Sequence, residues 1–172
     1  MADLYEKVTA QEDVFKKLVS KIPGFDGYVE RVNRRSADKL LRETIAAKFQ
    51  GLWQRISGIQ RDLVNAGRIE LLDDVEQAEI KIRQFIDRLN TAAYGYAGFF
   101  DAVKIRQDTL AEIYQYDLSL LEMADSVSLA IDNLEASLDS DGLPAAIRNL
   151  VQKAQDCLDA FNKRSEVMKM GQ

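Results

Sequence analysis

Asp117, the arginines between residues 31 and 42, and the tyrosines at 94 and 96 are the side chains whose chemistry stands out in this sequence. A carboxylate beside a guanidinium or a phenol can hold an anion, exchange a proton or tie two helices together. Histidine is absent and Cys157 is the single cysteine, which excludes Ser-His-Asp and Cys-His arrangements, an internal disulfide and a cysteine-based zinc site. The sequence therefore predicts no catalytic residue, no cofactor and no metal site.

Arginines are densest in the stretch IPGFDGYVERVNRRSADKLLR, residues 22–42. On a helix, Arg31 and Arg35 share one face, while Arg34 and Arg42 share another with Asp38. Three interpretations are open: a solvated face of paired charges, an internal clamp on carboxylates of a later helix, or a site for phosphate or an acidic partner.

The stretch YGYAGFFDAVKI, residues 94–105, interrupts the helical pattern with two glycines and four aromatic residues. It has no Lys-Ser/Thr and follows no strand, so it is not a phosphate loop. It is either an aromatic plug that caps the core against Phe25 and Tyr28, or an exposed patch that binds a partner.

Apolar residues spaced by three and four predict the helices that position these side chains. We expect helices over about 3–21, 28–66, 69–93, from Asp108 or Thr109 to about 139, and 144–169. Pro23 and Gly24 end the first, Asp26 is a candidate cap for the second, and Gly67 ends the second. The prediction is an all-α fold: an antiparallel bundle of four long helices (28–169) plus a shorter N-terminal helix (3–21), as one domain of residues 1–172.

The helix lengths bring the unusual features together. The second helix spans about 58 Å and the third about 38 Å, so residues 94–105 lie beside the start of the second helix. Asp117 sits in an otherwise apolar seam of the fourth helix and falls level with Asp38 to Arg42. An unpaired buried carboxylate is costly, so we expect Asp117 to bind an arginine of residues 31–42, Tyr94 or Tyr96.

Charge is unevenly distributed along the chain. Residues 28–68 carry nine basic and four acidic side chains, whereas residues 107–147 carry nine acidic and no basic ones. These two helices should therefore attract each other. The net charge of −5 argues against nucleic acid as a partner. No apolar run is long enough for a membrane span, and the N-terminal MADLYEKVTAQED is too charged for a signal peptide, so we expect a cytoplasmic protein.

Four strings resemble those of a group of bacterial and archaeal helical proteins for which no activity is established. They are PG-x-x-GY with Arg-Arg-x-Ala-Asp in residues 23–38, YGYxGFFD in residues 94–101, and YD-L-x-LLE in residues 116–122. The resemblance covers roughly residues 20–125. It implies a helical bundle and carries no mechanism.

The expected role is a non-enzymatic protein-interaction or scaffold protein that acts through the end of the bundle formed by residues 22–42 and 94–105. One alternative is a self-assembling structural subunit, because the heptad seams can pair with a second chain. Another is a small-ligand binder or enzyme that uses a buried Asp/Arg/Tyr cluster. The candidate binding residues are Arg31, Arg34, Arg35, Arg42, Tyr94, Tyr96, Phe99, Phe100, Asp101 and Asp117.

Overall fold

The computed structural model describes residues 2–170, except for the side chains of residues 2, 4, 5 and 170. Within that range it is built of helices and contains no strand, as predicted. The α-helices are α1 (Ala2–Lys21), α2 (Arg34–Asn65), α3 (Leu72–Thr91), α4 (Ala97–Asp101), α5 (Gln107–Ala136) and α6 (Leu143–Met170). Short 3₁₀ turns precede α2 (η1, Arg31–Asn33) and α3 (η2, Ile69–Leu71), and a third follows α3 (η3, Ala92–Gly95).

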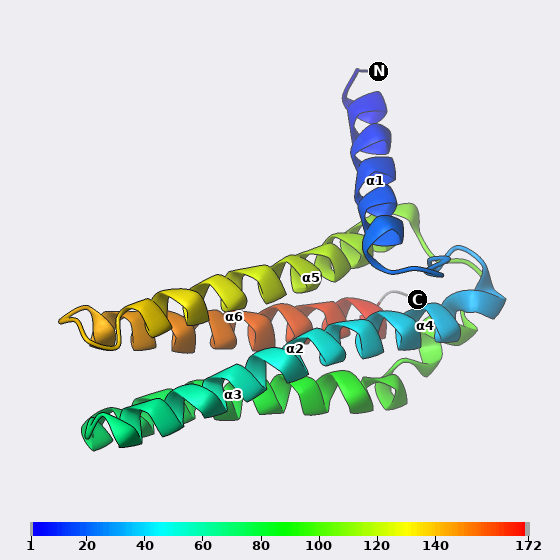
Figure 1. Cartoon of the computed structure of the whole chain (residues 1–172). Coiled ribbons are helices and arrows are strands. Elements are labelled where there is room, and N and C mark those ends of the chain that lie inside the picture. Colours follow the sequence, from blue (N-terminus) through cyan, green and yellow to red (C-terminus); the bar gives the residue numbers. More distant parts are fainter. Residues whose placement is uncertain (1, 171–172) are drawn as a thin grey trace.

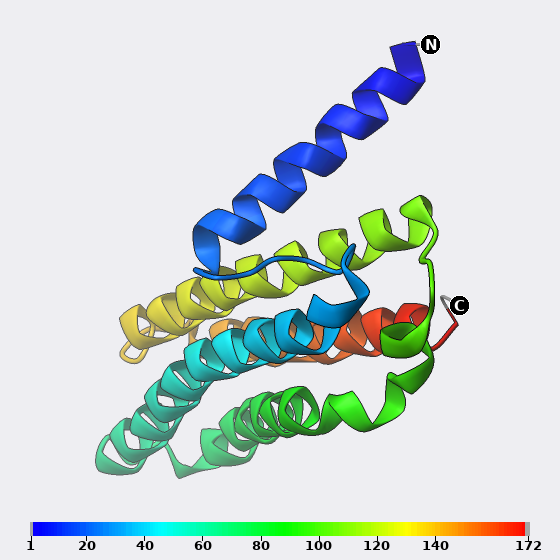
Figure 2. The same ribbon diagram turned by 90° about the vertical axis from the view of Figure 1, so that its right-hand side faces the viewer.

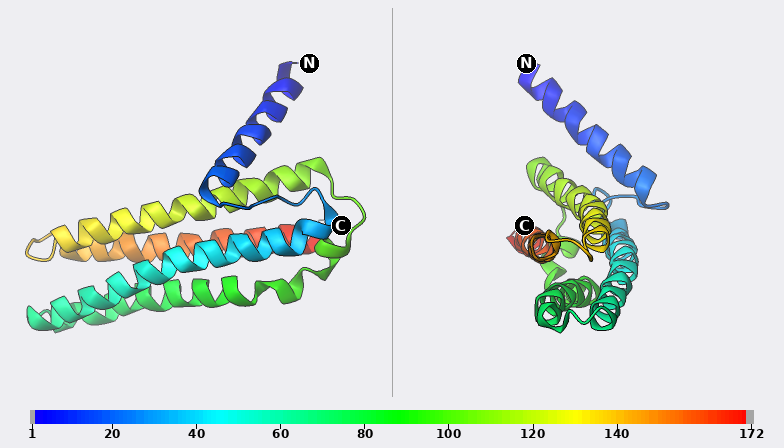
Figure 3. Two further views of the ribbon diagram at one scale, coloured as in Figure 1. Left: turned by 45° about the vertical axis from the view of Figure 1, so that its right-hand side comes forward. Right: turned by 60° about the vertical axis from the view of Figure 1, so that its left-hand side comes forward.

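Four long helices form the bundle, in the order α2, α3, α6, α5 around a common core (Figure 1). Helices that follow one another in the sequence, α2 with α3 and α5 with α6, run antiparallel, while α2 and α5 run side by side in the same direction (Figure 3). Both α2 and α5 start at one end of the bundle. We call this end, which also holds η1, η3, α4 and the residue 22–30 segment, the closed end.

The predicted apolar seams form the core. The seam residues of α2 are buried, namely Leu41, Ile45, Phe49, Leu52, Ile56, Ile59 and Leu63. So are Leu71 of η2 and the seam residues of α3, namely Val75, Ala78, Ile82, Phe85 and Leu89. Phe49, Phe85 and Phe161 meet edge to face between α2, α3 and α6, with ring centroids 4.7 and 5.9 Å apart. The expected attraction between α2 and α5 is also present, because Arg55 binds Asp132 and Glu135 across that contact.

The second helix is shorter than predicted. It begins at Arg34 rather than near residue 28, and Asp26 does not cap it. Gly24 and Gly27 adopt positive φ angles of 84° and 79°, which place the intervening chain in an irregular segment instead of a helical turn. The third helix likewise ends at Thr91, two residues early. Gly67 terminates α2 with φ 73°, as predicted.

Helix α1 does not lie along the bundle. It crosses the start of α5 and then projects into solvent (Figures 1 and 2). Leu18 and Ile22 near its C-terminal end are buried, whereas Val8, higher up the same stripe, is 46% exposed. Leu4, which the sequence places on this stripe, lies outside the described side chains. None of the described helices is long and apolar enough to cross a membrane.

Candidate functional site

A network of buried charges joins α2, α5, α6 and the residue 22–30 segment at the closed end. Asp117 Oδ1 accepts a hydrogen bond from Arg164 Nε at 2.5 Å, and Asp117 Oδ2 accepts one from the Tyr28 hydroxyl at 2.8 Å. Arg164 and Asp117 are both fully inaccessible to solvent. Charged groups this deeply buried are retained only when they are paired. Here the guanidinium of Arg164 on α6 pairs with the carboxylate of Asp117 on α5.

The same guanidinium reaches a second carboxylate. Arg164 Nη2 donates to Asp38 Oδ1 at 2.8 Å and to the Tyr28 hydroxyl at 3.0 Å. The other oxygen of Asp38 accepts from Arg42 Nε at 2.7 Å, and Arg42 Nη1 donates to the carbonyl of Leu89 at 2.5 Å. Two carboxylates and two guanidiniums therefore alternate across the core. We call Tyr28, Asp38, Arg42, Asp117 and Arg164 the polar cluster.

The burial of Asp117 and its level beside Asp38 agree with the sequence prediction, but the predicted partners were wrong. Asp117 binds Arg164 and Tyr28, rather than an arginine of residues 31–42, Tyr94 or Tyr96. The physical reason is that Arg42 is already bound to Asp38 on its own helix. Arg164 comes from α6, which packs between α3 and α5 and faces Asp117 directly.

Burial governs the protonation chemistry of the cluster. Loss of solvent raises the pKa of Asp117 to about 6, against the opposing effect of Arg164. Burial, together with the charge of Asp117, holds the pKa of the Tyr28 phenol well above its ordinary value. The phenol therefore stays a hydrogen-bond donor to Asp117 at neutral pH.

One atom of the cluster is left without a hydrogen bond. Arg164 Nη1 is buried and has no partner among the described residues. The guanidinium carbon lies 6.0 Å from the ring centroid of Tyr96, so the aromatic face supplies part of the missing stabilisation.

Arg34 is buried but forms no ion pair with any residue that the structure describes. Its Nε donates to the carbonyl of Tyr28 at 2.9 Å, and its Nη1 donates to the carbonyls of Phe99 at 3.2 Å and Ala102 at 2.5 Å. Tyr28 belongs to the residue 22–30 segment, Phe99 belongs to α4, and Ala102 is the residue that follows α4. Arg34 thus fastens the residue 22–30 segment and the end of α4 to the start of α2.

Of the two interpretations of residues 94–105, the structure shows the aromatic plug. Tyr96, Phe99 and Phe100 are buried, and Tyr28 contacts both Phe25 and Phe99 edge to face at 5.6 Å. These rings close the core above the polar cluster. The aromatic side chains of residues 96–100 are therefore not a surface that a partner can touch.

The remaining predicted site residues are on the surface and do not join the cluster. Arg31 and Arg35 are exposed, and Arg35 binds Asp101 at 2.8 Å while lying 4.8 Å from the ring centroid of Phe100. Tyr94 is 94% exposed. The predicted site thus divides into buried members (Arg34, Arg42, Tyr96, Phe99, Phe100, Asp117) and exposed members (Arg31, Arg35, Tyr94, Asp101).

An apolar groove lies beside the root of α1, where sequence reasoning had placed no site. It has a volume of about 260 Å³ and separates α1 from the first turns of α5. Its walls are mostly apolar and come from three segments: Val8, Gln11, Glu12 and Phe15 of α1, Val29, and Gln107, Leu110, Ala111 and Tyr114 of α5. We call this the α1 groove.

Gly27 sets the position of α1 against α5. A Cβ atom at this residue would lie 2.5 Å from the Tyr114 hydroxyl and 2.8 Å from the ring of Phe15. The hydroxyl of Tyr114 accepts the hydrogen bond of the Tyr28 backbone amide at 2.9 Å. The missing side chain therefore lets the 22–30 segment, α1 and α5 meet at one point.

Three members of the polar cluster, Tyr28, Asp38 and Arg164, are not among the predicted site residues. The sequence does contain a signal for Arg164. The seam of α6 runs through Cys157, Phe161 and Met168, and the position between the last two is Arg164. Arg164 in the seam of α6 is thus the basic counterpart of Asp117 in the seam of α5. The α2 seam, continued backward from Leu41, likewise falls on Asp38 and Arg34.

Comparison of the chain with protein-family models, with curated protein sequences and with solved structures finds no match. The evidence about function is therefore the geometry described above.

Proposed function

We propose that this chain is a non-enzymatic, cytoplasmic protein-interaction module that binds a helical segment of a partner through the α1 groove and the projecting half of α1. The surface belongs to the closed end of the bundle, beside the residue 22–42 segment. The buried aromatic residues of 96–100 do not line it.

The observation that carries this proposal is the contrast along the apolar stripe of α1. Leu18 and Ile22 are covered by the bundle, while Val8 continues the stripe beyond it at 46% exposure. Helices in proteins are stabilised mainly by packing of their apolar face, so the part of the α1 stripe that the bundle leaves uncovered lacks this stabilisation. A second helix laid into the α1 groove would supply that packing.

The burial and pairing of the polar cluster indicate that its role is structural. Asp117, Arg164 and Asp38 are fully buried and are hydrogen-bonded to one another across three elements. A substrate would reach them only if the bundle opened, and ion pairs of this kind hold helices in register. For this reason we place the working surface at α1 and not at the cluster.

A paired set of variants of the full chain tests the proposal. Val8→Glu/Val29→Glu places two charges in the α1 groove, at side chains 46% and 69% exposed. Val64→Glu/Leu129→Glu is the matched control, at apolar side chains 52% and 69% exposed elsewhere on the bundle. Neither pair lies in the core, so both variants should keep the wild-type melting temperature.

Affinity purification from the source cells, with quantification by mass spectrometry, is the measurement. We expect the same proteins to be enriched by wild type and control and to be lost from the groove variant by about tenfold, as for charges buried at an interface. Equal enrichment by all three chains would contradict the proposal, and so would the absence of any protein enriched above an unrelated bundle.

A further inference from the structure

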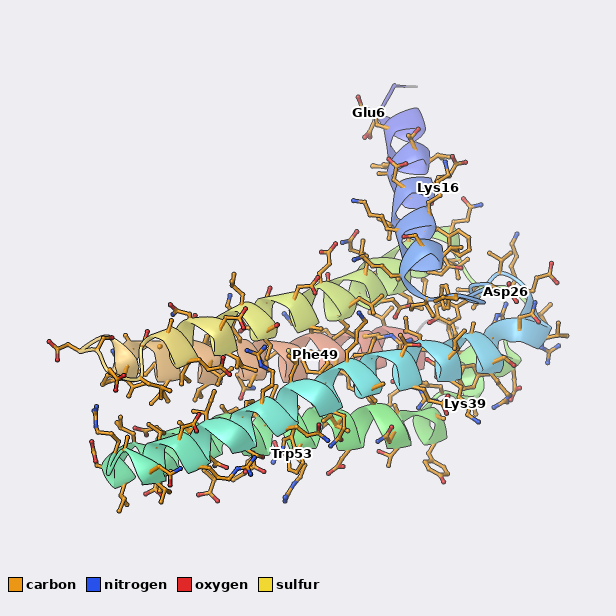
Figure 4. The ribbon with its side chains drawn as sticks, viewed as in Figure 1. Glu6, Lys16, Asp26, Lys39, Phe49 and Trp53 are labelled. Carbon is orange, nitrogen blue, oxygen red and sulfur yellow. The ribbon has the colours of Figure 1, made fainter. Side chains whose placement is uncertain are left out.

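A pocket with polar walls lies at the closed end, between the end of α3 and the last turns of α6. It has a volume of about 460 Å³ and is lined by Arg88, Thr91, Ala92, Gly95, Tyr96, Phe161, Asn162, Ser165, Glu166 and Lys169. Figure 4 shows Glu6 and Lys16 on α1 above α5, whereas α3 runs along the opposite edge of the bundle. The pocket is therefore separate from the α1 groove, and we call it the α6 pocket.

Two cations and one acid line the α6 pocket. Arg88 comes from α3, while Glu166 and Lys169 come from α6. All three side chains are exposed, and none of them forms an ion pair with another residue that the structure describes. Two positive charges and one negative charge give the pocket lining a net charge of +1.

The positions of both cations are defined. Arg88 Nη1 donates a hydrogen bond to Asn162 Oδ1 at 2.9 Å, which holds the guanidinium between α3 and α6. A guanidinium has five N–H donors in a planar fork, so most of them remain for a ligand. A Cβ atom at Gly95 would lie 2.9 Å from Lys169 Cε and 3.6 Å from Lys169 Nζ. The Lys169 side chain therefore lies directly over the backbone of Gly95.

A pair of hydroxyl groups adds a neutral donor to the same pocket. The Tyr96 hydroxyl and Ser165 Oγ lie 2.8 Å apart, and either can be the donor. Burial raises the pKa of the Tyr96 phenol, so the phenol stays protonated at neutral pH. Whichever hydroxyl donates within the pair, the other still has a hydrogen to offer to a ligand.

We propose that the α6 pocket binds a small molecule with two carboxylates and one ammonium group, as in an acidic amino acid. Arg88 and Lys169 belong to different helices, so each can hold one carboxylate, and Glu166 can hold the ammonium group. The ligand's net charge of −1 complements the +1 of the lining. This inference does not depend on the proposed function, because the α6 pocket shares no residue with the α1 groove.

The helix ends favour this ligand over a simple anion. Thr91 is the last residue of α3, and α6 ends one residue after Lys169. Carbonyl groups at the C-terminal end of a helix carry partial negative charge, which attracts cations and repels anions. An ammonium group is attracted both by these ends and by Glu166, whereas a phosphate ion is repelled by both.

Isothermal titration calorimetry of the full chain tests the proposal. L-glutamate is the probe, and glutarate, which lacks the ammonium group, is the comparison. We expect saturable binding of one L-glutamate per chain, and about tenfold weaker binding of glutarate, as for the loss of a hydrogen bond to a charged group. Absence of L-glutamate binding at about 10 mM overturns the proposal. Binding of L-lysine or inorganic phosphate as tight as that of L-glutamate also overturns it.

Variants of the two cations test which residues hold the carboxylates. Arg88→Gln and Lys169→Gln should each weaken the binding of both probes by about tenfold. Arg83→Gln and Lys163→Gln are the matched controls, because each removes an exposed cation of the same helix that does not line the pocket. The controls should leave both affinities within about twofold of wild type, since exposed charges at a distance are screened. Equal weakening by variants and controls overturns the proposal.

Glu166→Gln tests the site of the ammonium group. It should weaken the binding of L-glutamate by about tenfold and should not weaken that of glutarate, so the preference between the probes disappears. A preference that survives in Glu166→Gln overturns the proposal. All five substituted side chains are exposed, so we expect wild-type melting temperatures throughout. The α1 groove variant Val8→Glu/Val29→Glu should bind L-glutamate as wild type does, which separates this test from that of the proposed function.

Discussion

The polar cluster and the α1 groove lie at the same end of the molecule but treat charge and apolar surface in opposite ways. In the cluster, Asp38, Asp117 and Arg164 are fully buried and each finds an opposite charge. On α1, Val8 stays 46% exposed and lines a groove with mostly apolar walls. The buried residues of the predicted site therefore stabilise the fold. Residues that form an ordinary amphipathic stripe in the sequence are left available.

This difference indicates that a charged residue in an apolar seam marks a point where ion pairs hold helices together. It also indicates that an apolar stripe left partly uncovered marks a surface where a partner can bind. Buried ion pairs add little stability relative to well-packed apolar residues, but breaking one of them is costly. The polar cluster should accordingly dominate the effects of substitution, and the exposed charges should have small effects.

The largest expected effect is at the centre of the cluster. Asp117→Ala leaves Arg164 buried without its main partner and should lower the free energy of unfolding by about 3–5 kcal/mol. Urea denaturation followed by circular dichroism measures it. Asp101→Ala, which removes an exposed acid that also binds an arginine, is the control. A loss below about 1 kcal/mol for Asp117→Ala would show that the pair is not buried in solution.

The next effect concerns the junction between the two regions. Gly27→Ala must adopt φ 79° and place its Cβ against Tyr114 and Phe15, so we expect a loss of about 2–4 kcal/mol and a displaced α1. Gly24→Ala shares the positive φ of 84° but has its nearest neighbour at 3.8 Å. Gly24→Ala should therefore lower the free energy of unfolding only by the cost of the positive φ angle, about 1–2 kcal/mol. Equal melting temperatures for the two variants would refute the close contact at Gly27.

A pH series sharpens the description of the cluster. The pKa of Asp117 is about 6 in the folded chain, above its ordinary 3.8, so the folded state binds this proton more tightly than the unfolded state. Its contribution to stability is then largest at low pH and is lost as pH rises through 6. Relative to Asp117→Asn, wild type should gain about 1 kcal/mol between pH values of about 7 and 5. A relative loss on acidification would mean that pairing with Arg164 outweighs burial.

The smallest effect is expected on the outer surface of the closed end. Arg35 and Asp101 form an exposed pair, and exposed pairs contribute about 0–1 kcal/mol. Arg35→Ala should therefore lower the melting temperature slightly. The decrease should be somewhat larger than loss of the ion pair alone would give, because Arg35 also lies over the ring of Phe100. A thermal shift as large as that of Asp117→Ala would place Arg35 in the locking network.

Helix periodicity predicted the bundle, the core and the anomaly at Asp117, because seam spacing and helix length are local quantities. The same rule, continued along α6, reaches Arg164. It could not separate buried Tyr96 from exposed Tyr94, because the 3₁₀ turn between α3 and α4 resets the helical phase. Nor could it give the direction of α1, which depends on the positive φ angles of Gly24 and Gly27 and on the contact of Gly27 with Tyr114.

The claim that α1 is open while the polar cluster is closed can be tested most directly by hydrogen exchange of the full chain. The amides of residues 6–13 should exchange quickly, because the bundle does not cover them, while those of residues 114–121 should stay protected. Exchange of residues 6–13 that is as slow as that of residues 114–121, or fast exchange around Asp117, would contradict this description.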